Sequence, residues 1–256
     1  KITFTMSGFT KCFRPTSNFP TDYSDLRGWL SADSLVTFDI PNKRVTRVGD
    51  RTSVSQVNAS YVIQETVNKQ PTRIGYDGIN DKTYLSFDGV RQTLLSENYL
   101  MVTTQSSFTI FEVSKFGDIN ELVFSHVKED TRKIQIGLNE DDEFYAQAVF
   151  GAQDLTVTIG NTTHIKGAPH IGVVRRTHTG TEVDKLEAWY YDANNQKSNT
   201  EIATSVIAHW TDGGFYIGSY RGDSLFLSGE FNELIIYNRA LSDDEVNEIV
   251  GYLNYK

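Results

Sequence analysis

The chain has 256 residues, of which 39% are hydrophobic and 22% are charged, a mixture that can bury a substantial core. Its formal net charge of −9 would repel phosphate backbones and anionic headgroups, which excludes nucleic acid and membrane surfaces as partners. No apolar run reaches the roughly 18 residues that a membrane span needs, and the single cysteine, Cys12, excludes an intrachain disulfide. Because β-sandwiches often run to about 200–250 residues, one large domain is expected.

The first 20 residues are expected to form an arm or linker, and residues 21–256 the domain. Ile2, Phe4 and Met6 alternate with polar residues as in a strand, and prolines then interrupt regular structure. An exposed apolar edge of this kind is costly in water. The arm is therefore predicted to contact other chains, by adding to the edge of their sheets.

The middle of the chain is a series of strand-length runs separated by short turns. The strongest runs are rich in β-branched and aromatic residues and lie at 107–113, 122–124, 133–138, 155–159, 170–175, 186–191 and 215–218. Short turns join antiparallel strands, since a parallel pair needs a crossover of about a dozen residues or more. We therefore predict an all-β fold, a two-sheet antiparallel sandwich. Gly218 and Gly229 are expected to bracket a hairpin.

A short helix is predicted at the C-terminal end. Ser242 and Glu245 have the spacing of a capping box, in which each side chain accepts from the backbone N–H of the other. Apolar residues then recur at helical spacing, namely Val246, Ile249, Val250 and Leu253. This stripe is predicted to pack on the sandwich.

The segment GEFNELIIYNRALSDDE at 229–245 resembles the closing strand and helix of concanavalin A-like lectin/glucanase domains of the laminin G-like kind. Further similar pieces appear in the same order, at Trp29, Gln70-Pro71, 84–89, 107–111 and 215–218. The resemblance covers about residue 25 to the end and implies a jelly-roll of two curved antiparallel sheets. It also implies a non-catalytic module that binds glycans or proteins, on a phage virion or in cell-surface adhesion, and therefore an extracellular or virion-surface location.

An enzymatic alternative is open at residues 182–187. They resemble the Glu-x-Asp-x-x-Glu signature of laminarinase and lichenase-type glycoside hydrolases, which implies Glu182 as nucleophile, Glu187 as acid/base and Asp184 as their helper. Lys185 departs from the apolar residue of that family, and its charge would lower a pKa that an acid catalyst needs raised. The turn at Gly180 predicts that Glu182 and Glu187 do not face each other across a cleft.

Glycan binding would use exposed aromatic side chains on which a sugar ring can stack. The candidates are Trp189 and Tyr191, which share one face of a predicted strand, together with Trp210 and Tyr220. Packing in the core is the open alternative for each. Residues 221–223 spell the Arg-Gly-Asp tripeptide that integrins read, and a turn-rich hairpin tip explains it as well.

No cofactor is expected, although calcium is a possible ligand. Calcium takes six to eight oxygen ligands, and acidic loops at 77–81, 139–143 and 192–195 contain some. Solvated turns are the alternative account of these loops. The five histidines show no zinc-binding spacing.

Overall fold

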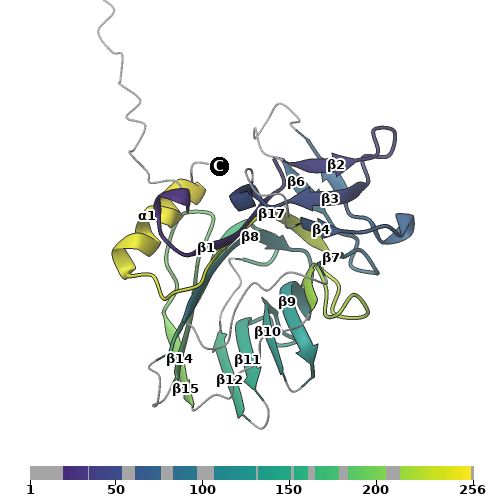
Figure 1. Cartoon of the computed structure of the whole chain (residues 1–256). Helices are drawn as coiled ribbons and strands as arrows, with labels where there is room; N and C mark the ends of the chain where they lie inside the picture. The colour runs from purple at the N-terminus through teal and green to yellow at the C-terminus, as the bar shows by residue number, and fades with distance from the viewer. Residues whose placement is uncertain are drawn as a thin grey trace, which may run out of the picture.

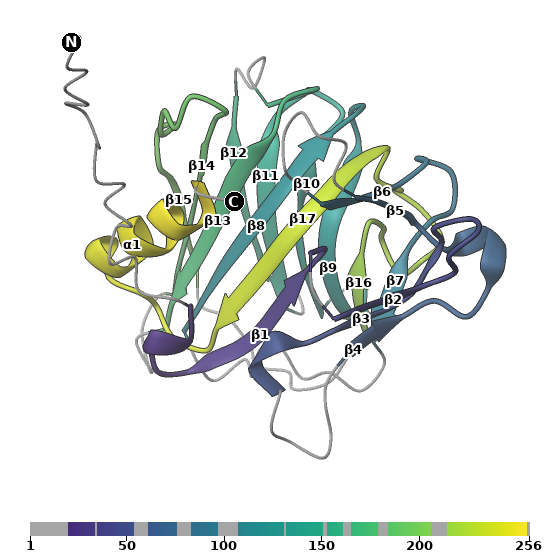
Figure 2. The same ribbon diagram turned by 90° about the horizontal axis from the view of Figure 1, so that it is seen from above.

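A computed structural model describes residues 20–33, 35–53, 61–75, 83–96, 107–130, 132–150, 153–160, 165–178, 184–205 and 214–254. Within these residues the chain folds into two antiparallel sheets with one short C-terminal helix (Figures 1 and 2). The described residues include three single-turn 3-10 helices: Pro20–Asp22 precedes the first strand, and Arg51–Ser53 and Val67–Lys69 lie between strands. No described helix is both long and apolar enough to cross a membrane.

Sheet A has eight strands, ordered β15-β14-β13-β8-β17-β6-β5, with β1 pairing with β17. Their bounds are β1 Leu26–Ser31, β5 Thr72–Ile74, β6 Tyr84–Ser86, β8 Phe108–Phe116, β13 His170–Thr177, β14 Asp184–Tyr191, β15 Glu201–Ser205 and β17 Gly229–Tyr237. The long strands β8 and β17 form its centre, where most side chains are buried.

Sheet B has nine strands, ordered β12-β11-β10-β9-β16-β7-β4-β3-β2. Their bounds are β2 Val36–Phe38, β3 Val45–Gly49, β4 Tyr61–Ile63, β7 Leu94–Ser96, β9 Glu121–Glu129, β10 Arg132–Leu138, β11 Phe144–Phe150, β12 Gln153–Ile159 and β16 Gly214–Ile217. The ring of Phe144 lies 5.9 Å from that of Tyr190 on β14, so aromatic side chains fill the space between the two sheets. The two-sheet antiparallel sandwich predicted from the sequence is confirmed.

Helix α1, Asp243–Asn254, covers the outer face of sheet A (Figure 2). The capping box is formed, since Ser242 N donates to Glu245 Oε2 at 2.9 Å and Glu245 N donates to Ser242 Oγ at 3.3 Å. The predicted apolar stripe is buried, with Ile249 fully enclosed. Tyr252 packs edge-on to Trp29 of β1, which fixes the helix against the sheet.

One expectation from the sequence is wrong, and another concerns residues outside the described part of the chain. Gly218 and Gly229 do not bracket a hairpin, because β16 belongs to sheet B and β17 to sheet A. The segment between them contains a tight turn, closed by the bridge between Tyr220 and Ser224, but it carries the chain from one sheet to the other. Residues 1–19, which hold nearly all of the predicted arm, lie outside the described part of the chain.

Candidate functional site

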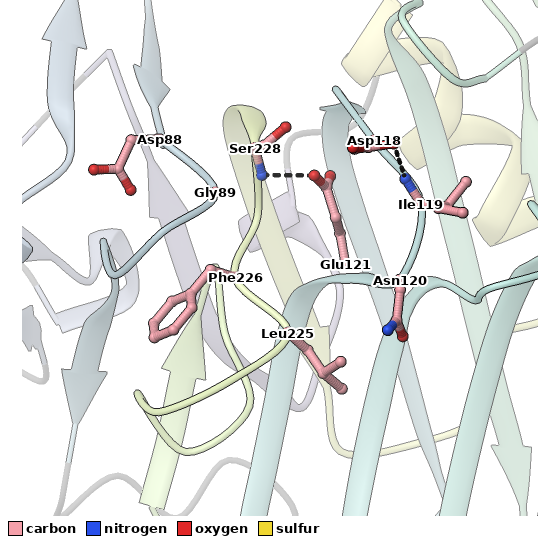
Figure 3. A pocket seen from close by; sticks show the side chains of 9 residues that line it. All are labelled: Asp88, Gly89, Asp118, Ile119, Asn120, Glu121, Leu225, Phe226 and Ser228. Atoms are coloured by element: carbon pink, nitrogen blue, oxygen red, sulfur yellow. Dashed lines mark hydrogen bonds between the residues drawn. The ribbon is translucent and has the colours of Figure 1, made fainter.

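A pocket of about 500 Å³ opens where three connections between strands meet (Figure 3). It is lined by residues that follow β6, that join β8 to β9, and that join β16 to β17: Asp88, Gly89, Asp118, Ile119, Asn120, Glu121, Leu225, Phe226 and Ser228. Its size falls within the usual range for small-molecule sites, about 300–1,000 Å³. The lining is mainly polar and also includes the apolar residues Ile119, Leu225 and Phe226.

Close packing of Ser228 holds these connections together. The backbone N–H of Ser228 donates to Glu121 Oε1 at 2.9 Å, the bond drawn in Figure 3. A Cβ atom at Gly117 would lie 1.7 Å from the carbonyl oxygen of Ser228, so only glycine allows this approach. Leu225 has a positive φ of 48°, an unfavourable conformation for a residue with a side chain. Backbone strain of this kind concentrates at functional sites.

Glu121 is the most unusual group in the pocket. Its side chain is 3% exposed, and its Oε2 atom has no hydrogen-bond partner. Burial raises the pKa of Glu121 to about 7, although the hydrogen bond from Ser228 to Oε1 and the nearby backbone of Asp118 and Gly117 partly offset this rise. The carboxyl therefore changes its charge near neutral pH.

The other two carboxyl groups are stabilised as anions or by turn contacts. The pKa of Asp118 lies below its usual value. The main cause is a hydrogen bond from the backbone N–H of Ile119, and Lys166 adds to the effect, with its Nζ 3.3 Å from Asp118 Oδ1. Asp88 Oδ1 accepts from three successive backbone N–H groups, the nearest being Val90 at 3.0 Å. Both side chains are exposed at the pocket rim.

The pocket can accept hydrogen bonds from a ligand rich in hydroxyl groups, while its apolar walls can contact the C–H face of a ring. Carboxylate oxygens, the Asn120 amide and the Ser228 hydroxyl supply acceptors, and the amide and hydroxyl also donate. The described residues contain no group of three histidine, cysteine or carboxylate side chains that could hold a metal ion.

The described residues of the hydrolase-like motif do not converge. β14 pairs with β13 without a bulge from Lys185 to Tyr191, so Asp184 and Glu187 point to opposite faces of sheet A. Asp184 is bound by Arg176 at 2.8 Å on the inner face. Glu182 lies outside the described residues, so the predicted separation of Glu182 and Glu187 stays a prediction.

Glu187 is held as an anion on the outer face. Burial alone would raise its pKa, but hydrogen bonds from Arg175 at 3.0 Å and Lys185 at 2.7 Å, with their charges, lower it overall. A general acid must hold its proton at working pH, and this environment favours the opposite state. The effect expected of Lys185 is therefore present, with Arg175 adding to it.

The predicted aromatic platform is largely enclosed. Trp189 is 2% and Tyr191 is 6% exposed, and the Tyr191 hydroxyl reaches Asn247 of α1 at 3.4 Å. Lys197 Nζ lies 4.7 Å and Arg175 Cζ 5.3 Å from the centre of the Trp189 ring, so neither ring offers a free face to a sugar. Trp210 lies outside the described residues, and a binding role for any of these residues stays a prediction.

Tyr220 is the most accessible of the described aromatic candidates. Its hydroxyl donates to Asp130 Oδ1 at 2.5 Å, and Lys133 Nζ lies 5.3 Å from its ring centre. The adjacent Arg221 also reaches Asp130, at 3.3 Å, and both Arg221 and Gly222 have positive φ. The Arg-Gly-Asp tripeptide thus sits in a tight turn with its guanidinium already paired.

Two of the acidic loops considered for calcium are organised by their own turn contacts. Asn139 Oδ1 accepts from the backbone N–H groups of Asp141 and Glu143, and Asp192 Oδ1 accepts from those of Asn194 and Gln196. Such side-chain bonds to the following backbone are ordinary turn chemistry. The loop at 77–81 lies outside the described residues.

Comparison with known proteins relates the chain to solved structures through its fold alone. No family model and no curated sequence matches it. Solved structures do. They include a GH54 α-L-arabinofuranosidase (TM-score 0.59, 10% identity, 91% of this chain and 60% of that one). They also include domain 4 of AbnA, a GH43 extracellular arabinanase from Geobacillus stearothermophilus, in complex with arabinotriose. That alignment has a TM-score of 0.54 and 14% identity, and it covers 88% of this chain and 98% of that one.

A third structure with this fold is the receptor binding domain of botulinum neurotoxin type G (TM-score 0.52, 11% identity). The alignment covers 90% of this chain and 52% of the toxin domain, so the chain spans about half of that domain. At these identities the shared property is the β-sandwich fold.

Sequence patterns indicated parts of the pocket but not the pocket itself. Asp88-Gly89 was recognisable as a turn, but Glu121, Asp118 and Phe226 were not singled out. One signal was present, an acidic residue at the start of the apolar run Leu122–Phe124. An acid next to buried strand residues is a candidate for an unusual pKa, and this rule would have selected Glu121.

Proposed function

We propose that this protein is a non-catalytic, lectin-like module that binds a glycan in the pocket between Asp88, Glu121 and Phe226. The observation that carries the proposal is the pocket itself, a hollow of about 500 Å³ whose lining combines hydroxyl-binding oxygens with the aromatic side chain of Phe226. Its volume suits one or two sugar units. The arabinotriose bound to the AbnA domain of similar fold supports the ligand class.

The charge of the pocket narrows the class of glycan. Its acidic side chains and the net charge of −9 would repel sialic acid, uronic acid or sulfated units. We therefore expect sugars without negative charge. Phe226 is the side chain expected to contact the sugar ring, because it is the aromatic residue among the described lining residues.

The test is a calorimetric titration of the protein with a panel of uncharged and acidic oligosaccharides that includes arabinotriose. Phe226→Ala should weaken binding of the uncharged ligand about tenfold or more, which corresponds to about 1.4 kcal/mol. Ile202→Ala is the matched control, since Ile202 is 53% exposed on edge strand β15 and does not line the pocket. Equal affinities of the two variants would refute the pocket as the site.

The wider setting is part of the same proposal. The resemblance to laminin G-like domains supports an extracellular or virion-surface module, with residues 1–20 contacting neighbouring chains. Deleting residues 1–20 should then leave a folded sandwich that no longer assembles. If the shortened chain fails to fold, the arm is a strand of the domain.

The proposal also predicts the absence of hydrolysis. The opposite orientations of Asp184 and Glu187, and the ion pairs of Glu187, support a non-catalytic role. Reducing-end assays with β-glucans should show no turnover above buffer for the wild type or for Glu182→Gln. Turnover that is lost in Glu182→Gln would establish the hydrolase alternative.

A further inference from the structure

The described lining of the pocket contains three acidic side chains and no basic one. Asp88, Asp118 and Glu121 supply the carboxyl groups, and Lys166 is paired with Asp118. An excess of carboxylates in a partly enclosed space attracts a positive charge and repels a negative one. The pocket is therefore complementary to a cationic ligand, beyond its ability to bind hydroxyl groups.

Glu121 gives this excess a specific point of attachment. Its carboxyl is almost completely buried on the pocket wall, and Oε2 has no partner although Oε1 is hydrogen-bonded to Ser228. A buried carboxylate oxygen without a partner is costly. The raised pKa of Glu121 reflects that cost. An ammonium group from a ligand would supply both the missing hydrogen bond and the missing charge.

We propose that the sugar bound in this pocket carries a free amino group, whose ammonium form is paired with Glu121. This inference rests on the proposed glycan-binding function and names the class of sugar. A bare metal ion fits less well, because the described residues contain no group of three metal-binding side chains. A lysine side chain would fill the space with methylene groups and leave the acceptors of Asp88 and Asn120 unused, whereas a hydroxylated ring uses them.

The test compares a trimer of glucosamine with a trimer of N-acetylglucosamine by calorimetry at pH 6, where a sugar amine is protonated. The glucosamine trimer should bind at least tenfold more tightly. Its binding should also release a proton from Glu121, so that the measured heat depends on the ionisation enthalpy of the buffer. In Glu121→Gln both the preference and the buffer dependence should disappear.

Asp154→Asn is the control variant, because it removes one negative charge from an exposed position on β12, away from the pocket. It should keep the tenfold preference. Equal affinity for the two trimers, or a preference that survives in Glu121→Gln, would overturn the inference while leaving uncharged glycan binding intact. Binding of calcium chloride or trilysine that depends on Glu121, without binding of glucosamine, would also overturn it. If no sugar of any kind binds, the proposed function fails as well.

Discussion

Glu121 shows how one side chain can make stability depend on pH. Because its pKa is raised by burial to about 7 in the folded chain, folding favours the protonated form over the charged one. Its contribution is therefore fully present below the pKa of the unfolded chain, near 4.5, and is lost as pH rises through 7. The change corresponds to about 3 kcal/mol.

Chemical denaturation from pH 4.5 to 8 tests this expectation. Relative to Glu121→Gln, the wild type should lose stability as pH rises, because only the wild type must bury a new charge. The difference between the two proteins isolates Glu121 from the other carboxyl groups. Parallel curves for the two proteins would show that the environment of Glu121 does not disfavour its charge.

Gly172 is a second position where a single side chain affects stability, because an added Cβ atom would disturb the packing between the sheets. A Cβ there would lie 2.2 Å from Oε1 of Glu112 and 2.8 Å from the ring of Phe144. Glu112 and His170 are fully buried and hydrogen-bonded at 2.9 Å between the sheets, so neither side chain can shift to make space for an added methyl group. Gly172→Ala should cost about 1–3 kcal/mol through overpacking.

The matched control is Gly251→Ala, whose added Cβ would meet nothing within 4 Å in helix α1. It should stabilise the protein by roughly 0.5–1 kcal/mol, because alanine favours the helix over glycine. Thermal unfolding measures both. A melting temperature of Gly172→Ala at or above that of the wild type would contradict the packing described between the sheets.

At the scale of elements, helix α1 depends on one buried stripe and one set of charges at its start. Ile249 is fully enclosed against sheet A, so Ile249→Ala should cost about 2–5 kcal/mol. Asp244→Ala, at an exposed position of the same helix, should change stability by about 0.5 kcal/mol or less. An unchanged melting temperature for Ile249→Ala would contradict the packing of the helix.

Local signals explain which elements were predictable. The C-terminal helix could be read from sequence because its capping box and its stripe are set by residues three or four apart. The long strands β8 to β10 and β12 to β14 were recognisable by their β-branched and aromatic runs. The short strands β1 to β7, of three to six residues, lack such runs, and their pairing with distant strands defines them.

At the scale of the whole molecule, the sandwich was predictable and the pocket was not. The hydrogen bond between Ser228 and Glu121 joins residues 107 positions apart, and Asp88 lies in a third connection. These groups meet because the chain crosses from sheet B to sheet A between β16 and β17, where the sequence suggested a hairpin. The aromatic residues chosen from the sequence failed as exposed platforms for a related reason, since Lys197 and Arg175 lie over the ring of Trp189 and Tyr191 contacts α1.

The central claim is that the sandwich binds a sugar in the pocket at the meeting point of its connections. The most direct test is a titration of the isotope-labelled protein with an uncharged or amino oligosaccharide, followed by backbone amide chemical shifts. Shift changes should centre on residues 88–89, 118–121 and 225–228 and should be lost in Phe226→Ala. Saturable changes centred instead on the outer face of β14 and α1, or an absence of changes with every sugar, would contradict the account.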